Sequence, residues 1–78
     1  MREKKLYKII TFHTTTDAMA MESQCMGSGI PGRLIPVPRE ITAGCGLAWR
    51  IPVQEYDAYA EKIEELKVNY DQITEVWI

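Results

Sequence analysis

A cysteine flanked by two glycines is the residue of this sequence that is best placed for chemistry. Cys45 lies between Gly44 and Gly46, a few residues after Pro36 and Pro38. Glycine neighbours leave a thiol uncrowded, and their amides can point at a bound anion or sulfur species. Because the thiolate is the nucleophilic form of cysteine, the pattern predicts a reactive sulfur that another molecule can reach.

The elements that must hold this cysteine alternate between strand and helix patterns. Residues 6–12 are rich in β-branched and aromatic side chains, which predicts a first strand. Thr14 and Asp17 have the spacing of a capping box, so a helix should begin there. The glycines at positions 27 and 29 should end this helix, because glycine accepts the left-handed conformation that closes helices.

The rest of the chain predicts three more strands and a second helix. The strands are expected over residues 33–37, 47–51 and 73–78. Pro36 has no amide hydrogen to donate, so its strand should lie at a sheet edge. After Pro52 comes an amphipathic helix whose apolar stripe is Tyr56, Tyr59, Ala60, Ile63, Leu66 and Tyr70.

This order of elements predicts a single α+β domain over residues 1–78. Two helical stripes are buried most simply when both helices lie on one face of a four-stranded antiparallel sheet. That is the ferredoxin-like βαββαβ sandwich, with strand order 4-1-3-2. The second and fourth strands are then the edges, which agrees with Pro36. A different small α+β sandwich is the competing layout.

The ferredoxin-like layout gives Cys45 a neighbourhood. The loop between the second and third strands lies at the sheet end where the first strand finishes and the first helix begins. The residues expected there with Cys45 are His13, Thr14, Thr15, Thr16 and Arg39. The helix amino terminus and Arg39 would favour a thiolate, and His13 would be its acid–base partner.

Each of these residues also has a simpler interpretation. Cys25 falls on the stripe of the first helix and is expected to be an inert core residue. Gly44 and Gly46 can serve only to shape a hairpin loop, and the threonines are helix caps in the simplest case. His13 can be an ordinary strand-end residue, and Arg39 a solvated charge at the sheet edge.

Composition limits the classes of function. The formal net charge is −2, which argues against a general nucleic-acid role, although Arg2, Lys4, Lys5 and Lys8 gather near the amino end. We expect neither a transmembrane segment nor a signal peptide, and therefore a cytoplasmic protein with reduced thiols. Two cysteines and one histidine are too few for a structural zinc site, so neither a metal nor another cofactor is expected.

The order of several motifs resembles a known family. Phe12 and the threonine run are followed by Ala18 and Glu22, then by PVPR at 36–39 and CGLA at 45–48. In this order and spacing they resemble the selenium/sulfur carrier-like proteins, formerly a domain of unknown function, over nearly the whole chain. The resemblance implies that Cys45 accepts sulfur or selenium as a persulfide or selenosulfide and passes it to an acceptor. A cysteine desulfurase would be a donor of the implied kind.

Three hypotheses follow. The leading one is that the protein is a small sulfur or selenium carrier rather than an enzyme that turns over a substrate. The second is an interaction module, a homodimer included, that acts through the sheet face without helices. Tyr7 with Ile9, or else Ile10 with Phe12, would line that face, near the apolar area of the two tryptophans, Trp49 and Trp77. The third is a thiol enzyme that uses Cys45 with His13. The hypothesis that the same two residues bind a metal ion has still less support.

Overall fold

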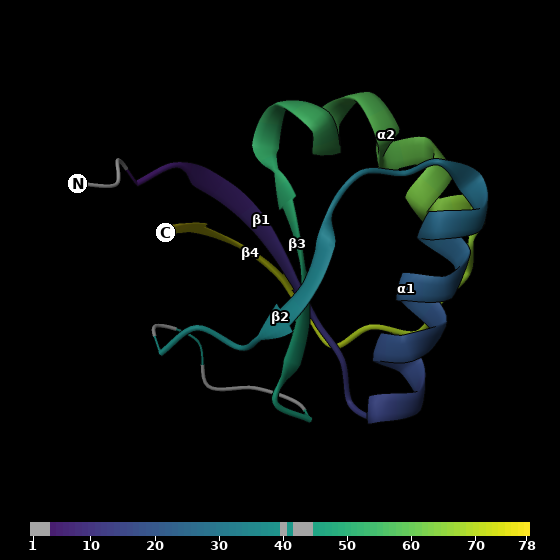
Figure 1. Cartoon of the computed structure of the whole chain (residues 1–78), viewed down its shortest axis with the longest axis horizontal. Helices are drawn as coiled ribbons and strands as arrows, with labels where there is room; N and C mark the ends of the chain where they lie inside the picture. The colour runs from purple at the N-terminus through teal and green to yellow at the C-terminus, as the bar shows by residue number, and fades with distance from the viewer. Residues whose placement is uncertain (1–3, 40, 42–44) are drawn as a thin grey trace.

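A computed structural model describes residues 4–39, 41 and 45–78 as a four-stranded sheet with two helices on one side (Figure 1). The elements are β1 (Leu6–Thr11), α1 (Thr15–Ser28), β2 (Arg33–Pro36), β3 (Leu47–Pro52), α2 (Val53–Glu65) and β4 (Ile73–Trp77). All neighbouring strands are antiparallel, in the order β2-β3-β1-β4. The predicted ferredoxin-like arrangement and strand order are therefore confirmed, with Pro36 in an edge strand.

Helix α1 begins and ends where local chemistry predicts. The Thr14 side chain accepts a hydrogen bond from the Asp17 amide at 3.1 Å, so it satisfies one of the free donors of the first turn. At the other end Gly29 is left-handed, with φ 71°, and the amides of Gly29 and Ile30 both bond to the Cys25 carbonyl. The inner side of the helix buries Ala18, Met21 and Cys25.

Helix α2 is shorter than its apolar stripe predicts. It ends at Glu65, and Lys67 adopts a left-handed conformation with φ 55°. Tyr70 therefore lies beyond the helix, 39% exposed, and its predicted place on the stripe is wrong. The stripe up to Leu66 does pack inward, with Ile63 buried.

The register of the sheet decides which side chains meet the helices. Ile10 pairs with Trp49 across β1 and β3, and both belong to the helix-side core together with Phe12 and Ile51. Trp49 is only 2% exposed, so its predicted place near the uncovered face is wrong. It was misplaced because a change of one residue in register moves every side chain of a strand to the other face.

The sheet face away from the helices has a small apolar cluster of its own. Ile9 and Ala48 are fully buried there, and Val76 is 7% exposed. Partly buried side chains pack around these three: Tyr7, Ile35, Val37, Ile41 and Ile78. The centre of this face is thus already covered within one chain. Among the helices of the described residues, none is long and apolar enough to span a membrane.

Candidate functional site

A backbone hydrogen bond fixes Cys45 at the end of β1. Its amide donates to the carbonyl of Phe12 at 2.9 Å, and this carbonyl belongs to the peptide bond that joins Phe12 to His13. Beside it, the Val37 amide donates to the Gly46 carbonyl at 2.9 Å and so continues the pairing of β2 with β3. Residues more than thirty positions apart in the sequence are therefore neighbours, as the topology predicts.

The side chain of Cys45 lies between the core and the solvent. It is half-buried and packs against the edge of the helix-side core, and its Sγ lies 4.0 Å from the carbonyl oxygen of Leu47. At that distance a thiol makes only a weak hydrogen bond. The sulfur is therefore accessible in part, and no strong polar contact restrains it among the described residues.

The two cysteines of the chain have opposite environments. Cys25 is fully buried in the helix-side core, and this burial raises the pKa of its thiol to about 11. Desolvation disfavours the charged thiolate, so Cys25 is an inert core residue, as its place on the helical stripe predicts. If one cysteine of this chain does chemistry in the folded state, it is Cys45.

This difference predicts selective alkylation of the native protein. With one equivalent of iodoacetamide at neutral pH, we expect Cys45 to react at least about a hundredfold faster than Cys25, because Cys25 must first be exposed by local unfolding. In concentrated urea the two rates should converge. Peptide mass spectrometry measures both, and equal rates in the native protein would contradict the burial of Cys25.

The residues predicted around Cys45 have different environments. The hydroxyl of Thr14 is engaged by the helix cap, while Thr15 and Thr16 lie exposed in the first turn of α1. Arg39 is exposed in a turn after β2, and among the described residues it is in no ion pair. Gly44 lies outside the described residues.

Gly46 has a backbone reason to be glycine. Its φ is +92°, in the region that side-chain-bearing residues rarely adopt, and a Cβ atom there would meet no described residue other than its two chain neighbours within 4 Å. The turn therefore needs this glycine for its backbone conformation.

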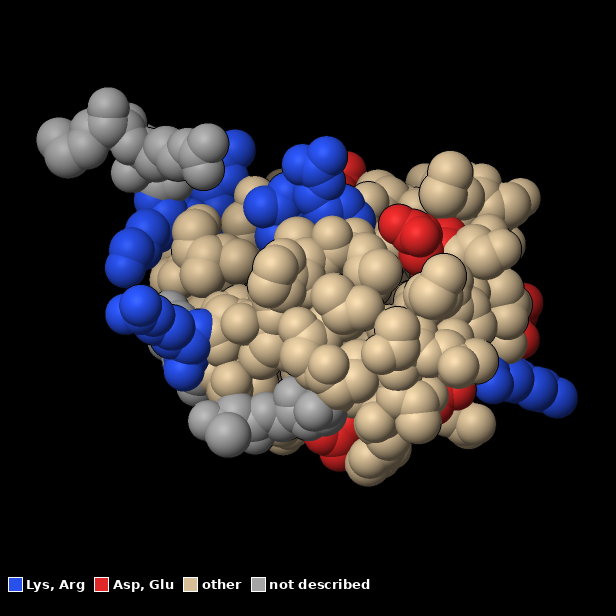
Figure 2. Space-filling view, turned by 60° about the horizontal axis from the view of Figure 1, so that its bottom comes forward, with Lys and Arg blue, Asp and Glu red and all other residues tan. Residues whose placement is uncertain are grey.

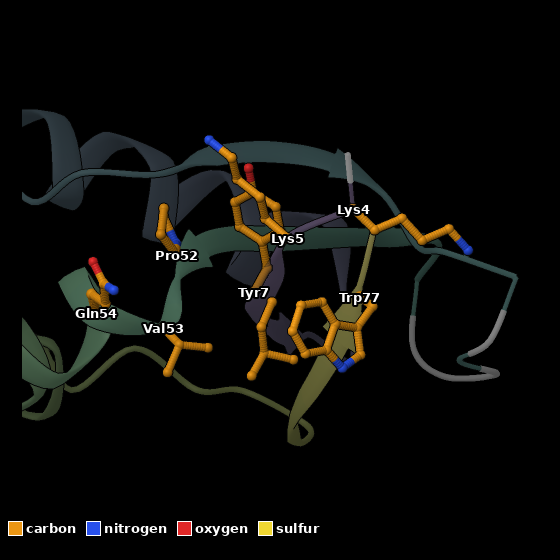
Figure 3. Close-up of a pocket in the computed structure, with 8 residues that line it drawn as sticks. Lys4, Lys5, Tyr7, Pro52, Val53, Gln54 and Trp77 are labelled. Atoms are coloured by element: carbon orange, nitrogen blue, oxygen red, sulfur yellow. The ribbon is translucent and has the colours of Figure 1, made fainter. Parts of the chain in front are cut away.

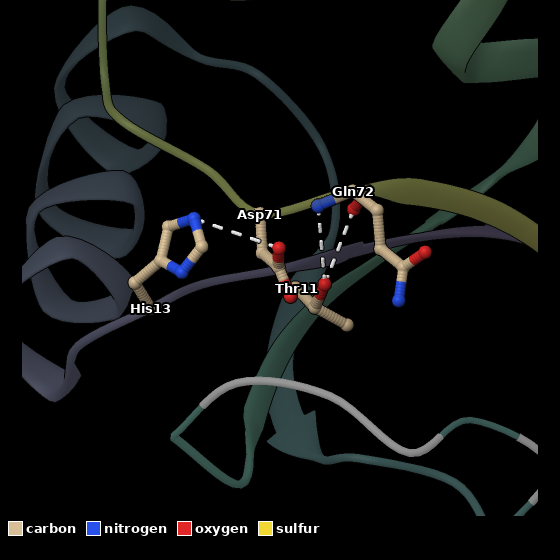
Figure 4. A network of polar contacts seen from close by, with 4 residues as sticks. All are labelled: Thr11, His13, Asp71 and Gln72. Atoms are coloured by element: carbon tan, nitrogen blue, oxygen red, sulfur yellow. Dashed lines mark hydrogen bonds and ion pairs between the residues drawn. The ribbon is translucent and has the colours of Figure 1, made fainter.

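His13 lies next to the Cys45 backbone, but its side chain has another partner. Its Nε2 atom is 3.5 Å from Oδ1 of Asp71, and the ring is largely exposed (Figure 4). No hydrogen bond joins His13 to Cys45 within the described part of the chain. The geometry thus gives no direct acid–base pair, and the role predicted for His13 stays a prediction.

Asp71 belongs to a polar network that sequence reasoning missed. The Thr11 side chain is fully buried, and its hydroxyl accepts from the Gln72 amide at 3.2 Å and lies 3.4 Å from the Gln72 carbonyl (Figure 4). The Asp71 amide donates to the Thr11 carbonyl at 2.7 Å. The predicted topology holds one signal for this network. In an antiparallel pair the start of the fourth strand lies beside the end of the first, which brings residues 71 and 72 next to Thr11.

These contacts describe a small α+β sandwich with one partly exposed cysteine at the end of its sheet, bonded through its backbone to the segment that leads into a helix. The residues described contain no group of three or more His, Cys, Asp or Glu side chains arranged to hold a metal ion.

Comparison with known proteins assigns the chain to a family. The family model described as "Putative Se/S carrier protein-like" matches residues 7–75, and the chain belongs to this family. The match includes β1 except its first residue, and the segment that holds Cys45. The comparisons with curated proteins and with solved structures found no match.

Proposed function

We propose that this protein carries sulfur or selenium on Cys45. The observation that supports the proposal most is the contrast between the two thiols, one half-buried at the sheet end and the other sealed in the core. Family membership points to the same chemistry. A carrier needs one accessible sulfur and no deep pocket, and Cys45 on its turn meets that need.

The transfer step is an exchange at sulfur. The Cys45 thiolate attacks the terminal sulfur of a donor persulfide, such as that of a cysteine desulfurase. A new S–S bond forms on Cys45 as the donor's S–S bond breaks, and its electron pair leaves on the donor thiolate. An acceptor nucleophile then attacks the terminal sulfur and releases Cys45 as a thiolate. Selenium in the terminal position follows the same course, and neither step requires an external oxidant.

The surroundings of Cys45 suit a persulfide anion. The Phe12 carbonyl holds the Cys45 backbone at a point three residues before α1 begins. A helix amino terminus carries a partial positive charge, and exposed Arg39 follows β2 at the same end of the sheet. Gly46 adds no side chain that would crowd a terminal sulfur atom. We infer that these groups would stabilise the negative charge of a persulfide bound at Cys45.

Sulfur loading and a matched pair of variants test the proposal. The protein is incubated with a cysteine desulfurase, pyridoxal phosphate and cysteine, and is then weighed by intact mass spectrometry. We expect the wild type and Cys25→Ala to gain one sulfur atom, and Cys45→Ser to gain none. Loading that survives Cys45→Ser, or a wild type that never loads, would refute the carrier role.

The alternative, an interaction module on the uncovered sheet face, has less support. The centre of that face is buried within one chain, and two arginines, Arg33 and Arg50, are paired directly across β2 and β3. Like charges opposite each other destabilise a sheet, and a two-fold contact through this face would bring four of them together. A homodimer of this kind stays a prediction that sedimentation over a dilution series can test.

A further inference from the structure

A cavity lies at the end of the sheet opposite Cys45. It has a volume of about 610 Å³ and is formed where β1 begins, β3 passes into α2 and β4 ends (Figure 3). The Cys45 amide is hydrogen-bonded to the carbonyl of Phe12, the residue that follows the last residue of β1. The cavity lies where β1 begins, so it is separate from the proposed carrier site. Its volume falls within the range of about 300–1,000 Å³ that is typical of small-molecule sites.

One part of the cavity wall is apolar and exposes a large aromatic surface. This part consists of Leu6, Val53 and Trp77. The Trp77 side chain is 59% exposed, whereas Trp49 is buried. In Figure 3 the side chains of Val53 and Trp77 lie on the same side of the sheet. The burial of a ligand's aromatic or aliphatic group against this exposed indole lowers the free energy of binding, because both surfaces are removed from water.

The remaining wall is basic. Lys4 and Lys5 line the cavity together with Tyr7, and none of the described residues that line it is acidic. Figure 3 shows the Lys5 chain beside Tyr7 and the Lys4 chain extending outward, and such flexible stems can place their ammonium groups over a bound anion. Arg50 does not line the cavity, but its guanidinium lies 4.7 Å from the centre of the Tyr7 ring, on the sheet face away from the helices.

The charge distribution of the whole chain makes this basic end distinctive. The net charge is −2, yet in the view of Figure 2 most Lys and Arg side chains gather toward the left, where in Figure 1 β1 begins and β4 ends. Lys8, which follows on β1, is neutralised by Glu75 at 2.8 Å, whereas Lys4, Lys5 and Arg50 are in no ion pair among the described residues. Unpaired cations beside an apolar cavity are complementary to an organic anion.

We infer that this cavity binds a small organic anion, with an apolar or aromatic body against Trp77, Leu6 and Val53 and an acidic group held by Lys4 and Lys5. A phosphate ester and a carboxylate share this chemistry. The site does not depend on Cys45, so it stands or fails independently of the carrier role.

Three ligands with one body and different head groups test the inference: 4-phenylbutyl phosphate, 5-phenylvalerate and 4-phenylbutanol. None of them absorbs where tryptophan is excited selectively, so Trp77 emission reports binding, and Trp77→Phe shows which tryptophan gives the signal. We expect both anions to bind saturably and at least about tenfold more tightly than the alcohol, because the lysines recognise charge. The order of the two anions identifies the acidic group.

Two double variants of equal charge separate a local site from a general effect of net charge. Lys4→Gln with Lys5→Gln should weaken both anions about tenfold and leave the alcohol unchanged. Lys62→Gln with Lys67→Gln, near the far end of α2, should change none of the three affinities. Equal binding of the alcohol and the anions, equal losses in the two double variants, or a signal that persists in Trp77→Phe would each overturn the inference.

Discussion

Replacing Gly32 by alanine is expected to lower the free energy of unfolding by about 2 to 4 kcal/mol. The φ angle of Gly32 is +127°, where a side chain is strained whatever the space around it. There is also no space, because a Cβ atom would lie 2.7 Å from the Arg50 carbonyl oxygen and 2.7 Å from Cε2 of Trp49, and would collide with Nε1 of Trp49. Trp49 is buried in the core and cannot swing aside.

Gly27 provides the matched control for this prediction. It lies within α1, its φ is not positive, and a Cβ atom there would meet nothing within 4 Å. Gly27→Ala should therefore stabilise the protein by about 0.5 to 1 kcal/mol, since alanine is the better helix former. Urea unfolding followed by tryptophan fluorescence measures both variants. Equal midpoints for the two would contradict the close packing of Gly32 on the indole.

Alkaline pH is expected to destabilise the protein through Cys25. Burial raises the pKa of this thiol from 9.0 to about 11 in the folded chain. Between these two values the unfolded state has released the proton while the native state still holds it, so stability falls as pH rises. The full loss from this one group is about 2 to 3 kcal/mol, and it is complete above pH 11.

The contribution of Cys25 is isolated by a difference between two proteins. Lys8 also has a raised pKa, because it donates to Glu75, and its contribution is likewise lost as pH rises through the native pKa. Cys25→Ala removes only the thiol contribution. We expect its unfolding free energy to decline less steeply than that of the wild type between pH 9 and 11, when both are measured with a phosphine reductant present. If the unfolding free energies of the wild type and Cys25→Ala decline in parallel, the Cys25 thiol has the same pKa in the folded and unfolded states, and the prediction is wrong.

Local signals predicted most of the fold because they depend on neighbours in the sequence. Thr14 caps a helix through Asp17, three residues away, and Gly29 ends that helix through the backbone of its last turn. Pro36 marks an edge strand because it lacks a donor, whatever the rest of the chain does. With these elements placed, few topologies remained, and they already set Cys45 beside the end of β1.

The features that sequence reasoning missed depend on long-range register or on a single backbone angle. Trp49 was misplaced because only its pairing with Ile10 decides which face of the sheet it occupies. Tyr70 was added to the second helix because nothing in the sequence marks the left-handed turn at Lys67, which is not a glycine. Asp71 reaches His13 only through the closure of β4 against β1. Such contacts require the assembled sheet.

The most direct test of the carrier proposal is to locate the transferred atom on the loaded protein. Trypsin separates the two cysteines, because cleavage after Arg39 and Arg50 isolates Cys45 while cleavage after Arg33 leaves Cys25 on another peptide. After loading by a desulfurase and capping with iodoacetamide, mass spectrometry should find one additional sulfur atom on peptide 40–50 and none on the peptide with Cys25. An unmodified peptide 40–50, or sulfur on the Cys25 peptide instead, would contradict the proposal that Cys45 carries it.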